Sequence, residues 1–265
     1  METALPTAVA PPAPPILSPW DLPRVRAGFM GRRGGVSTGA YASLNLAHWL
    51  GDDLNAVAEN WRRWRGANPA LRPAILHQVH AATVLRVNDG DAILNGVRPR
   101  ADGMIATATG IALCTFTADC VPILLADEEA HVAAALHAGW RGTLANIAGA
   151  GIEAMVRAGA RPDRMRAAAG PSIGPCCFEV DAELAEEFTR QIAVASAHTR
   201  PGRSGKAFID LRGIVDGQLK RAGLDPSLIS SIGPCTKCHP EDYFSRRAAG
   251  GVITGLQMSF IGFSD

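Results

Sequence analysis

Three short apolar segments follow one another closely between residues 111 and 139, and they set the main limit on how this chain can fold. They are residues 111–116 (IALCTF), 121–127 (VPILLAD) and 131–139 (HVAAALHAG), and only a few polar residues separate them. Apolar runs of this length between turn residues are typical of buried strands. We therefore expect consecutive strands here, with a break between the first two at residues 117–120.

Helical patterns surround these strands. Apolar residues spaced three and four apart after the pair Asp52-Asp53 predict a capped amphipathic helix that begins near Leu54. A second helix is expected after residue 139, with its apolar face toward the sheet. Strands alternating with helices, together with hairpin-like strand pairs, predict a mixed sheet in an α/β (α+β) fold. The apolar residues of the second helix are Leu144, Ile147, Ile152, Met155 and Val156.

The composition narrows the class of protein. With 47% hydrophobic and 19% charged residues, the 265-residue chain can bury a sizeable core, which excludes general disorder. A formal net charge of +1 argues against nucleic acid or an anionic membrane as a partner. No apolar run reaches the roughly 18 residues of a membrane helix.

The first residues are rich in proline and lack the basic start of a signal peptide. We expect residues 1–19 to form a flexible proline-rich arm and residues 20–265 to form a single catalytic domain. Without an export signal, a cytoplasmic protein is expected.

Six cysteines are too few for a disulfide scaffold in a chain of this length, so thiols are expected. Cys235-Thr-Lys-Cys238-His239 has the spacing of covalent haem attachment, which requires export. Packing cysteines or an adventitious metal site is the better interpretation. The turn around Cys176 and Cys177, rich in glycine and proline, could hold a cysteine nucleophile. The six are Cys114, Cys120, Cys176, Cys177, Cys235 and Cys238.

Two residues stand at the ends of predicted strands, where functional groups are often displayed. Cys120 follows the break after the first strand, and His137 lies near the end of the third. His77 and His80 fall in an apolar segment, residues 75–87, that resembles a strand, so only one of them should face a given site. A thiolate with imidazoles suits zinc, with copper as a competitor, and three protein ligands leave a position open. A buried thiol and core histidines are the alternative.

Taken together, these segments resemble the YfiH family, also described as the polyphenol oxidase or laccase-domain family. The matching segments occur in order over about residues 28 to 247. The motifs that carry the resemblance are Arg32-x-Gly-Gly-Val-Ser37, Ser43-Leu-Asn45-Leu, Gln78-Val-His80, Thr117-Ala-Asp-Cys120-Val-Pro, His137-Ala-Gly-Trp-Arg-Gly142, Gly170-Pro-Ser-Ile-Gly-Pro-Cys-Cys, Asp210-Leu and Cys235-Thr.

The resemblance implies a YfiH-like four-layer α/β/β/α domain and a zinc ion bound by His80, Cys120 and His137, with Cu²⁺ as the alternative metal. It also implies phosphorolysis of purine nucleosides (adenosine, inosine and S-methyl-5'-thioadenosine) and adenosine deamination. We expect a monomer or homodimer that binds these nucleosides and phosphate. Ala81 replaces a usual glycine and Leu256 replaces an expected arginine, changes that leave the three ligands intact.

Further roles follow on this hypothesis. Asp119 is a candidate acid/base, or a residue that caps the turn. Cys120 and Arg141 complete the predicted catalytic set, since a guanidinium could stabilise an anionic transition state. Phe178 could stack on a purine, although an aromatic side chain in an apolar turn is more often part of the core.

The glycine-rich segment near the N-terminus offers polar contacts to the substrate. Arg32 and Ser37 lie in one loop that could bind phosphate, and Asn45 could contact ribose or base. Surface arginines and local turn bonding are the alternatives.

Two other enzyme classes remain open. A copper-dependent polyphenol oxidase needs several coppers, and seven scattered histidines are few for a multinuclear centre. A cysteine hydrolase, of the kind involved in peptidoglycan editing, could use Cys120, Cys176 or Cys177. A protein without catalytic activity, in which these side chains only pack, is a third possibility.

Overall fold

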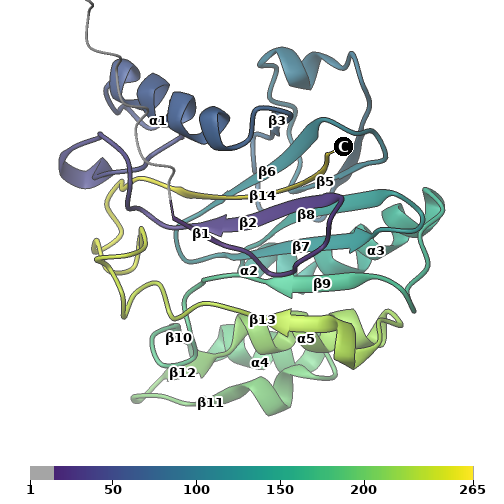
Figure 1. The fold of residues 1–265 in the computed structure, drawn as a ribbon. Helices are drawn as coiled ribbons and strands as arrows, with labels where there is room; N and C mark the ends of the chain where they lie inside the picture. The colour runs from purple at the N-terminus through teal and green to yellow at the C-terminus, as the bar shows by residue number, and fades with distance from the viewer. Residues whose placement is uncertain (1–14, 265) are drawn as a thin grey trace, which may run out of the picture.

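The computed structural model describes residues 15–264, which form two large β-sheets packed face to face between helices (Figure 1). The five-stranded sheet contains, in order, β1 (Ile16–Leu17), β2 (Val25–Met30), β14 (Gln257–Phe263), β6 (Ile111–Thr117) and β3 (Arg72–Ile75). The six-stranded sheet contains β13 (Ile229–Ser231), β9 (Arg166–Ala169), β7 (Val121–Asp127), β8 (Val132–Ala138), β5 (Gly103–Ala106) and β4 (Val84–Val87). Both sheets mix parallel and antiparallel pairs, as predicted.

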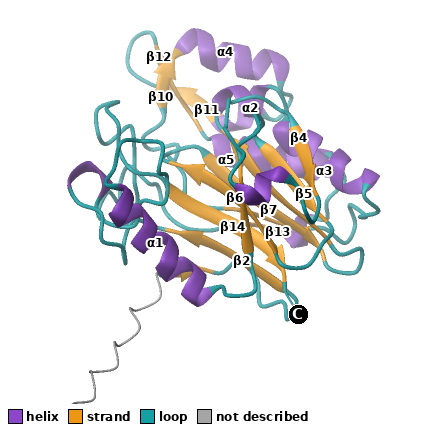
Figure 2. Cartoon of the chain, turned by 90° about the horizontal axis from the view of Figure 1, so that it is seen from above, coloured by secondary structure: helices purple, strands orange, loops and turns teal. Residues whose placement is uncertain are grey.

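A small third sheet and the helices complete the fold. The third sheet contains β10 (Glu179–Asp181), β12 (Lys206–Ile209) and β11 (Thr199–Pro201). The α-helices are α1 (Leu54–Ala67), α2 (Trp140–Leu144), α3 (Ile147–Arg157), α4 (Ala182–Gln191) and α5 (Leu211–Arg221). Short 3-10 helices span Gly39–Tyr41, Ala92–Asn95, Ala195–His198 and Pro226–Leu228. Figure 2 shows α1 on one side of the strands and the other helices on the opposite side.

Helix α1 covers the outer face of the five-stranded sheet. Asp53 caps it by accepting a hydrogen bond from the Asn55 N–H at 2.8 Å, as the sequence predicts. Trp61 and Trp64 point from the helix to the sheet, and the Trp64 ring meets Phe260 edge-on with ring centroids 5.4 Å apart. An aromatic stripe at helical spacing therefore joins the first two layers.

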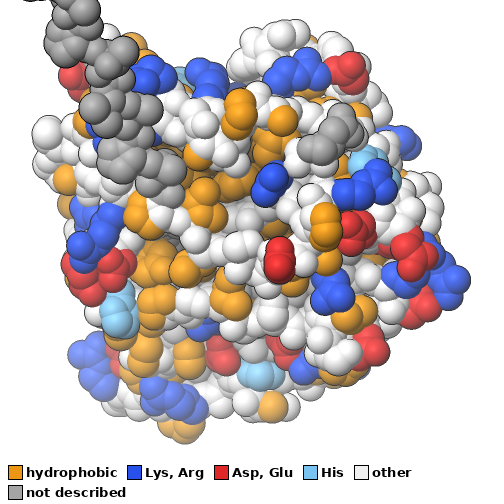
Figure 3. Space-filling view, in the orientation of Figure 1, with side chains coloured by type: hydrophobic (Ala, Val, Ile, Leu, Met, Phe, Trp, Pro, Cys, Tyr) orange, Lys and Arg blue, Asp and Glu red, His pale blue; other side chains and the backbone are white. Residues whose placement is uncertain are grey.

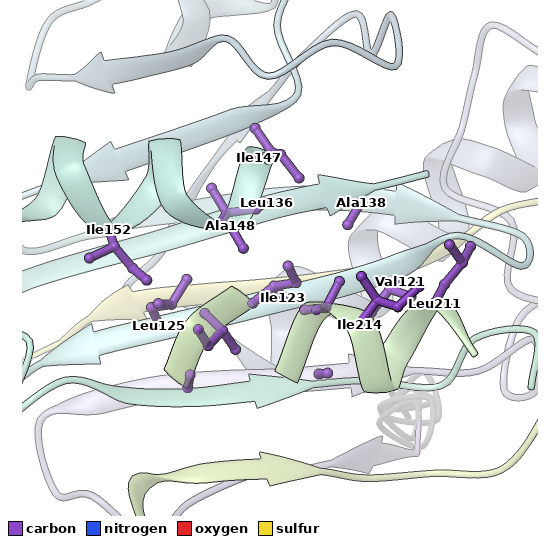
Figure 4. Packing of buried hydrophobic residues seen from close by; sticks show 14 of the residues in the cluster. Val121, Ile123, Leu125, Leu136, Ala138, Ile147, Ala148, Ile152, Leu211 and Ile214 are labelled. Atoms are coloured by element: carbon purple, nitrogen blue, oxygen red, sulfur yellow. The ribbon is translucent and has the colours of Figure 1, made fainter. Parts of the chain in front are cut away.

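The strands of the six-stranded sheet are apolar along their whole length because both of their faces are covered. In β7, Ile123 and Leu125 pack toward α3 and α5, whereas Leu124 and Ala126 pack against the other sheet. Figure 4 shows the helix side of this packing, with Ile152 of α3 above the strands. The four-layer α/β/β/α arrangement is thus confirmed.

The chain passes between the two large sheets four times, and two of these connections bear on the sequence predictions. The first apolar strand, β6, belongs to the five-stranded sheet, and the chain crosses at residues 118–120 to β7 of the six-stranded sheet. The segment 75–87 is not one strand, contrary to the prediction. β3 ends at Ile75, and a loop of residues 76–83 crosses to β4. The break occurs because the two short strands pair with partners in different sheets.

The proline-rich arm was predicted to extend to residue 19. Its residues 1–14 lie outside the described residues, but Ile16 and Leu17 form β1 and pair with Met30 and Phe29. This part of the predicted arm therefore belongs to the sheet. None of the helices in residues 15–264 combines the length and the apolar character needed to cross a bilayer. Positive and negative side chains are interspersed on the face drawn in Figure 3.

Candidate metal centre and its pocket

Three potential metal ligands meet at one end of the sandwich. Cys120 immediately precedes β7, and His137 lies near the end of β8. These strands are antiparallel neighbours, and pairing of Pro122 with His137 brings the two ligands together although 17 residues separate them in sequence. His80 comes from the loop between β3 and β4. The donor atoms of the three side chains lie within 4.8 Å of one another.

Asp102 organises this group from behind. Its carboxylate is fully buried, accepts the N–H groups of Val79, His80 and Ala81 at 3.1, 2.9 and 2.8 Å, and lies 2.8 Å from Nδ1 of His137. Three successive N–H groups on one carboxylate hold the loop in a conformation in which His80 has a φ of +61°. One side chain therefore positions both imidazoles.

The hydrogen bond to Asp102 also selects the ring nitrogen that faces the other ligands. Because Nδ1 of His137 bonds to the carboxylate, Nε2 is the nitrogen left for Cys120, His80 or a cation. A carboxylate behind a ligand imidazole is the usual arrangement in zinc proteins.

Cys120 and His137 influence each other's ionisation. Burial alone would raise the pKa of the Cys120 thiol, but the charge of His137 and hydrogen bonds from His137 and His80 lower it to about 6. Burial would lower the pKa of His137, but Cys120 and Asp102 raise it to about 9. Hydrogen bonds from His137 and the loop outweigh burial at Asp102 and lower its pKa as well. The site thus favours a thiolate at Cys120, the form that binds metal.

Gly139 gives the ligands room to approach. A Cβ at this position would lie 2.8 Å from Cδ2 of His80 and 3.2 Å from Sγ of Cys120. The first of these distances forces a displacement of the His80 ring. A side chain after β8 would therefore separate two of the ligands.

The residues present fit a single zinc ion. Two imidazoles and one thiolate are zinc donors, the Asp102–His137 pair supplies the supporting carboxylate, and a three-ligand set keeps one position for a reactant. The donor set also accommodates copper, so it does not by itself fix the metal.

The candidate centre forms part of the wall of a pocket of about 530 Å³. This volume falls in the range of small-molecule sites. The remaining wall residues come from the end of β6 and the residue after it, from the loop that carries His80, from the loops around residues 49 and 98, and from the segment before β14. The full lining is Trp49, Leu50, Leu76, His77, Gln78, His80, Arg98, Phe116, Thr117, Ala118, Cys120, His137, Arg246, Ile253, Thr254 and Leu256.

The pocket combines flat apolar rings with positive charge. The Trp49 ring meets Phe116 edge-on at 5.2 Å, and the guanidinium of Arg98 stacks over Trp49 at 3.4 Å from the ring centroid. Arg246 adds a second guanidinium to the wall. Gln78 is held by its amide, which exchanges two hydrogen bonds of 2.8 Å with the backbone of Phe116.

His77 corrects one sequence prediction. Both His77 and His80 line the same pocket, whereas a strand would have placed them on opposite sides. The prediction was wrong because the segment is a loop bonded to Asp102.

The predicted phosphate loop does not line this pocket. Arg32 donates to two backbone oxygens and stacks on Phe244 at 4.7 Å. Ser37 and Asn45 are buried and both donate to Asp52, at 2.7 and 2.9 Å. In the structure these groups stabilise the folded loop through protein contacts.

Asp119 lies on the other side of Cys120, with a φ of +100°. One of its carboxylate oxygens accepts from Thr236 Oγ1 and the other from the Arg247 N–H, both at 2.7 Å. It lines a smaller pocket of about 270 Å³, together with Cys120 and Phe178. These bonds give Asp119 a clear role in positioning the segment that carries Cys120.

The structure separates Phe178 and Arg141 from the main pocket. Phe178 is buried beneath Arg247, whose guanidinium lies 5.4 Å from the ring centroid. Arg141 is exposed on α2 and lies over the Trp140 ring at 4.1 Å.

Sequence reasoning missed several residues of the site, above all Asp102. The only signal for Asp102 is an acidic residue directly before the apolar strand β5, and its partners are separated from it by more than 20 residues in sequence. Trp49, Arg98 and Arg246 lie in loops, where no periodic pattern marks a residue as part of a wall.

The fold and the pocket define a class of four-layer α/β/β/α proteins with a His₂Cys group at one end of the sandwich. The chain belongs to the family described as multi-copper polyphenol oxidoreductase laccase, whose model matches residues 26–264. The predicted membership of the YfiH family is thereby confirmed.

Named relatives and solved structures agree with this assignment. The chain is 35% identical over 249 residues to the purine nucleoside phosphorylase YfiH of Shigella flexneri, covering 93% of this chain and 97% of that protein. It is 35% identical over 223 residues to the adenosine deaminase RL5 of an unknown prokaryotic organism, covering 80% and 84%. The crystal structure of YlmD from Geobacillus stearothermophilus superposes with a TM-score of 0.85 at 32% identity, covering 92% and 93% of the two chains. At the level of the family, these relatives support an enzyme that acts on purine nucleosides.

Proposed function

We propose that this protein is a zinc-dependent purine nucleoside phosphorylase that cleaves adenosine, inosine and S-methyl-5'-thioadenosine and also deaminates adenosine. The observation that carries the proposal is the group of His80, Cys120 and His137, which opens onto a pocket of suitable size for a nucleoside. Relatives named for phosphorolysis and for deamination support the reaction classes.

His80, Cys120 and His137 would hold the zinc ion. When bound there, zinc would supply Lewis-acid chemistry to the reaction. Asp102 keeps Nδ1 of His137 occupied and holds the His80 loop, so the donor atoms are oriented before a cation arrives. Cys120 contributes the negative charge of a thiolate at pH values above about 6, the pKa of its thiol.

The pocket wall supplies the substrate contacts in this proposal. Trp49 and Phe116 offer aromatic surface for a purine ring, and Arg98 and Arg246 offer positive charge for phosphate. We assign substrate binding to these residues because they line the pocket, whereas the loop of Arg32 does not. Asp119 acts as a positioning residue.

A second candidate function has a specific observation in its favour. Cys120, His137 and Asp102 are linked in the order thiol, imidazole and carboxylate, which is the arrangement of a cysteine nucleophile with its base and orienting group. The lowered pKa of Cys120 suits a nucleophile as well as a ligand. A cysteine hydrolase is therefore the alternative that the test must separate.

Copper oxidase chemistry finds less support in the arrangement of donors. Within residues 15–264, the groups of three or more potential ligands contain two histidines at most. A multinuclear copper centre uses more imidazoles than that.

The direct test is incubation of zinc-loaded protein with adenosine or inosine, with and without phosphate. We expect free base that depends on phosphate, and a smaller amount of inosine formed from adenosine without phosphate. Cys120→Ala should abolish both activities and lower the zinc content, and Cys114→Ala is the matched control because Cys114 is buried in the core. Absence of both products from the zinc-loaded wild type would refute the proposal. Activity that resists chelation but is lost on alkylation of Cys120 would favour the hydrolase.

A further inference from the structure

Four cysteines that the proposed reaction does not use lie together outside the pocket. Cys176 and Cys177 belong to the loop after β9, and Cys235 and Cys238 belong to the loop after β13. Their sulfur atoms all lie within 4.8 Å of one another, although about 60 residues separate the two pairs in sequence. The parallel pairing of β9 with β13 explains the convergence, because the two loops leave the same end of neighbouring strands.

Two distances between these sulfur atoms are close to those in a tetrahedral metal site. Sγ of Cys238 lies 3.7 Å from Sγ of Cys176 and 3.4 Å from Sγ of Cys177. A tetrahedron with zinc–sulfur bonds of about 2.3 Å has sulfur–sulfur edges of about 3.8 Å. A disulfide bond measures only about 2.05 Å. The four groups are free thiols at a separation that suits a shared cation.

Packing does not explain the cluster. Cys176 and Cys238 are exposed, whereas a cysteine that serves the core is buried, as Cys114 is in β6. Cys235 and Cys238 also have the C-x-x-C spacing of metal-binding loops. Cys177 and Cys235 are half-buried against the core, but packing does not account for the two exposed thiols beside them, so the four together are better explained as ligands.

The backbone around the cluster is shaped for a thiolate. The N–H of Gly174 donates to Sγ of Cys235 at 3.1 Å, and the N–H of Cys238 closes a turn onto the carbonyl of Cys235 at 3.2 Å. A Cβ at Gly174 would lie 3.1 Å from Cβ of Cys235 and 3.3 Å from Sγ of Cys176. Glycine at this position thus allows the two loops to approach closely.

Positive groups stand next to the cluster. Arg200 donates to the carbonyl of Pro175 at 3.0 Å, and Arg247 donates to the carbonyls of Cys177 and Glu179 at 3.5 and 2.8 Å. Four thiolates around a divalent cation carry a net charge of −2, which neighbouring guanidinium groups offset in part.

We propose that Cys176, Cys177, Cys235 and Cys238 bind a second, structural zinc ion. Four protein ligands leave no position open for a reactant, so this site serves the fold and not the reaction. It fastens the Cys235–Cys238 loop, and the Thr236 hydroxyl of that loop donates to Asp119, the neighbour of Cys120. The second ion would therefore steady one side of the first site.

The test counts zinc in the full-length protein, purified with zinc and dialysed against buffer without chelator. We expect about two equivalents in the wild type, about one in Cys120→Ala, and about one in Cys176→Ser with Cys238→Ser. The Cys120→Ala protein retains all four cysteines of the cluster, so its result does not depend on whether the double variant folds. Cobalt in place of zinc should give strong sulfur-to-metal absorption in Cys120→Ala, and Cys114→Ala should match the wild type.

Differential alkylation with mass spectrometry provides the second measurement. In zinc-loaded Cys120→Ala, the four cysteines should resist alkylation until a strong chelator is added. An unmetallated Cys120→Ala protein whose four thiols react at once would overturn the proposal. So would a disulfide between the two loops in freshly purified protein. Neither outcome depends on nucleoside turnover, so the proposal can fail while the proposed function stands.

Discussion

Asp102 is the most informative residue to perturb, because one carboxylate holds both imidazoles of the candidate centre. In Asp102→Asn, only one of the two side-chain atoms can still accept hydrogen bonds. If the amide oxygen faces His80 and His137, the NH₂ group opposes the N–H groups of Val79 and Ala81. If the amide oxygen faces Val79 and Ala81, the NH₂ group opposes the His80 N–H and donates to Nδ1 of His137. The ring proton of His137 then moves to Nε2, where it blocks metal binding.

The magnitude follows from the bonds that are lost. The first orientation removes two hydrogen bonds to a fully buried carboxylate and the second removes one, each worth about 1.5–3 kcal/mol. We therefore expect the free energy of unfolding without metal to fall by about 1.5–6 kcal/mol. Loss of a supporting carboxylate typically lowers metal affinity about 10- to 100-fold. In the wild type, the contribution of Asp102 to stability should begin to decline as the pH falls below about 4 and should be lost as the pH passes through the lower pKa of the folded chain.

The assay combines zinc affinity, from competition with a chromophoric chelator, with urea unfolding of the metal-free protein. Asp127→Asn is the matched control, since Asp127 is also buried and accepts N–H groups from Ala130 and Arg161 at 3.0 and 2.8 Å, away from the pocket. It should lose stability without losing zinc affinity. Wild-type zinc affinity in Asp102→Asn, or the same loss in both variants, would show that Asp102 does not organise the centre.

Three further predictions concern the centre and the loop near the N-terminus. Gly139→Ala should lower zinc affinity at least about tenfold by displacing His80, whereas Gly66→Ala, with open space around it, should bind zinc normally; equal affinities would contradict the steric argument. In metal-free protein, alkylation of Cys120 should accelerate as the pH rises through about 6, the pKa of its thiol, and a midpoint near 9 would show that the histidines do not stabilise the thiolate. Asn45→Ala should lower the free energy of unfolding by about 1–3 kcal/mol while leaving the KM for adenosine unchanged. A raised KM in a fully folded variant would show instead that Asn45 contacts the substrate.

The strands and helices were predictable where the chain repeats a simple pattern. Strands β7 and β8 are visible in the sequence as continuous apolar runs because both of their faces are buried. Helix α1 is visible because burial of one helix face gives apolar residues spaced three and four apart after a capping residue. The assignment of β6 and β7 to different sheets was not predictable from such runs, since both strands are buried along their whole length.

The candidate ligands were identified through the family motifs, and the structure brings them together. Their chemical setting was beyond sequence reasoning, because it depends on long-range pairing: Asp102 reaches His80 and His137 only after β4, β5 and β8 have paired. The predicted substrate contacts Ser37 and Asn45 illustrate the opposite case. Polar residues in a glycine-rich loop look available for a ligand, but here the side chains of both residues donate hydrogen bonds to Asp52.

His80 and Cys120 lie on two of the four connections between the sheets, and this placement has a mechanical consequence. Each connection is anchored in one sheet at its start and in the other at its end. A cation bound by both residues would link the two connections. Binding of the cation would then make that end of the sandwich more rigid, and its loss would make it less rigid.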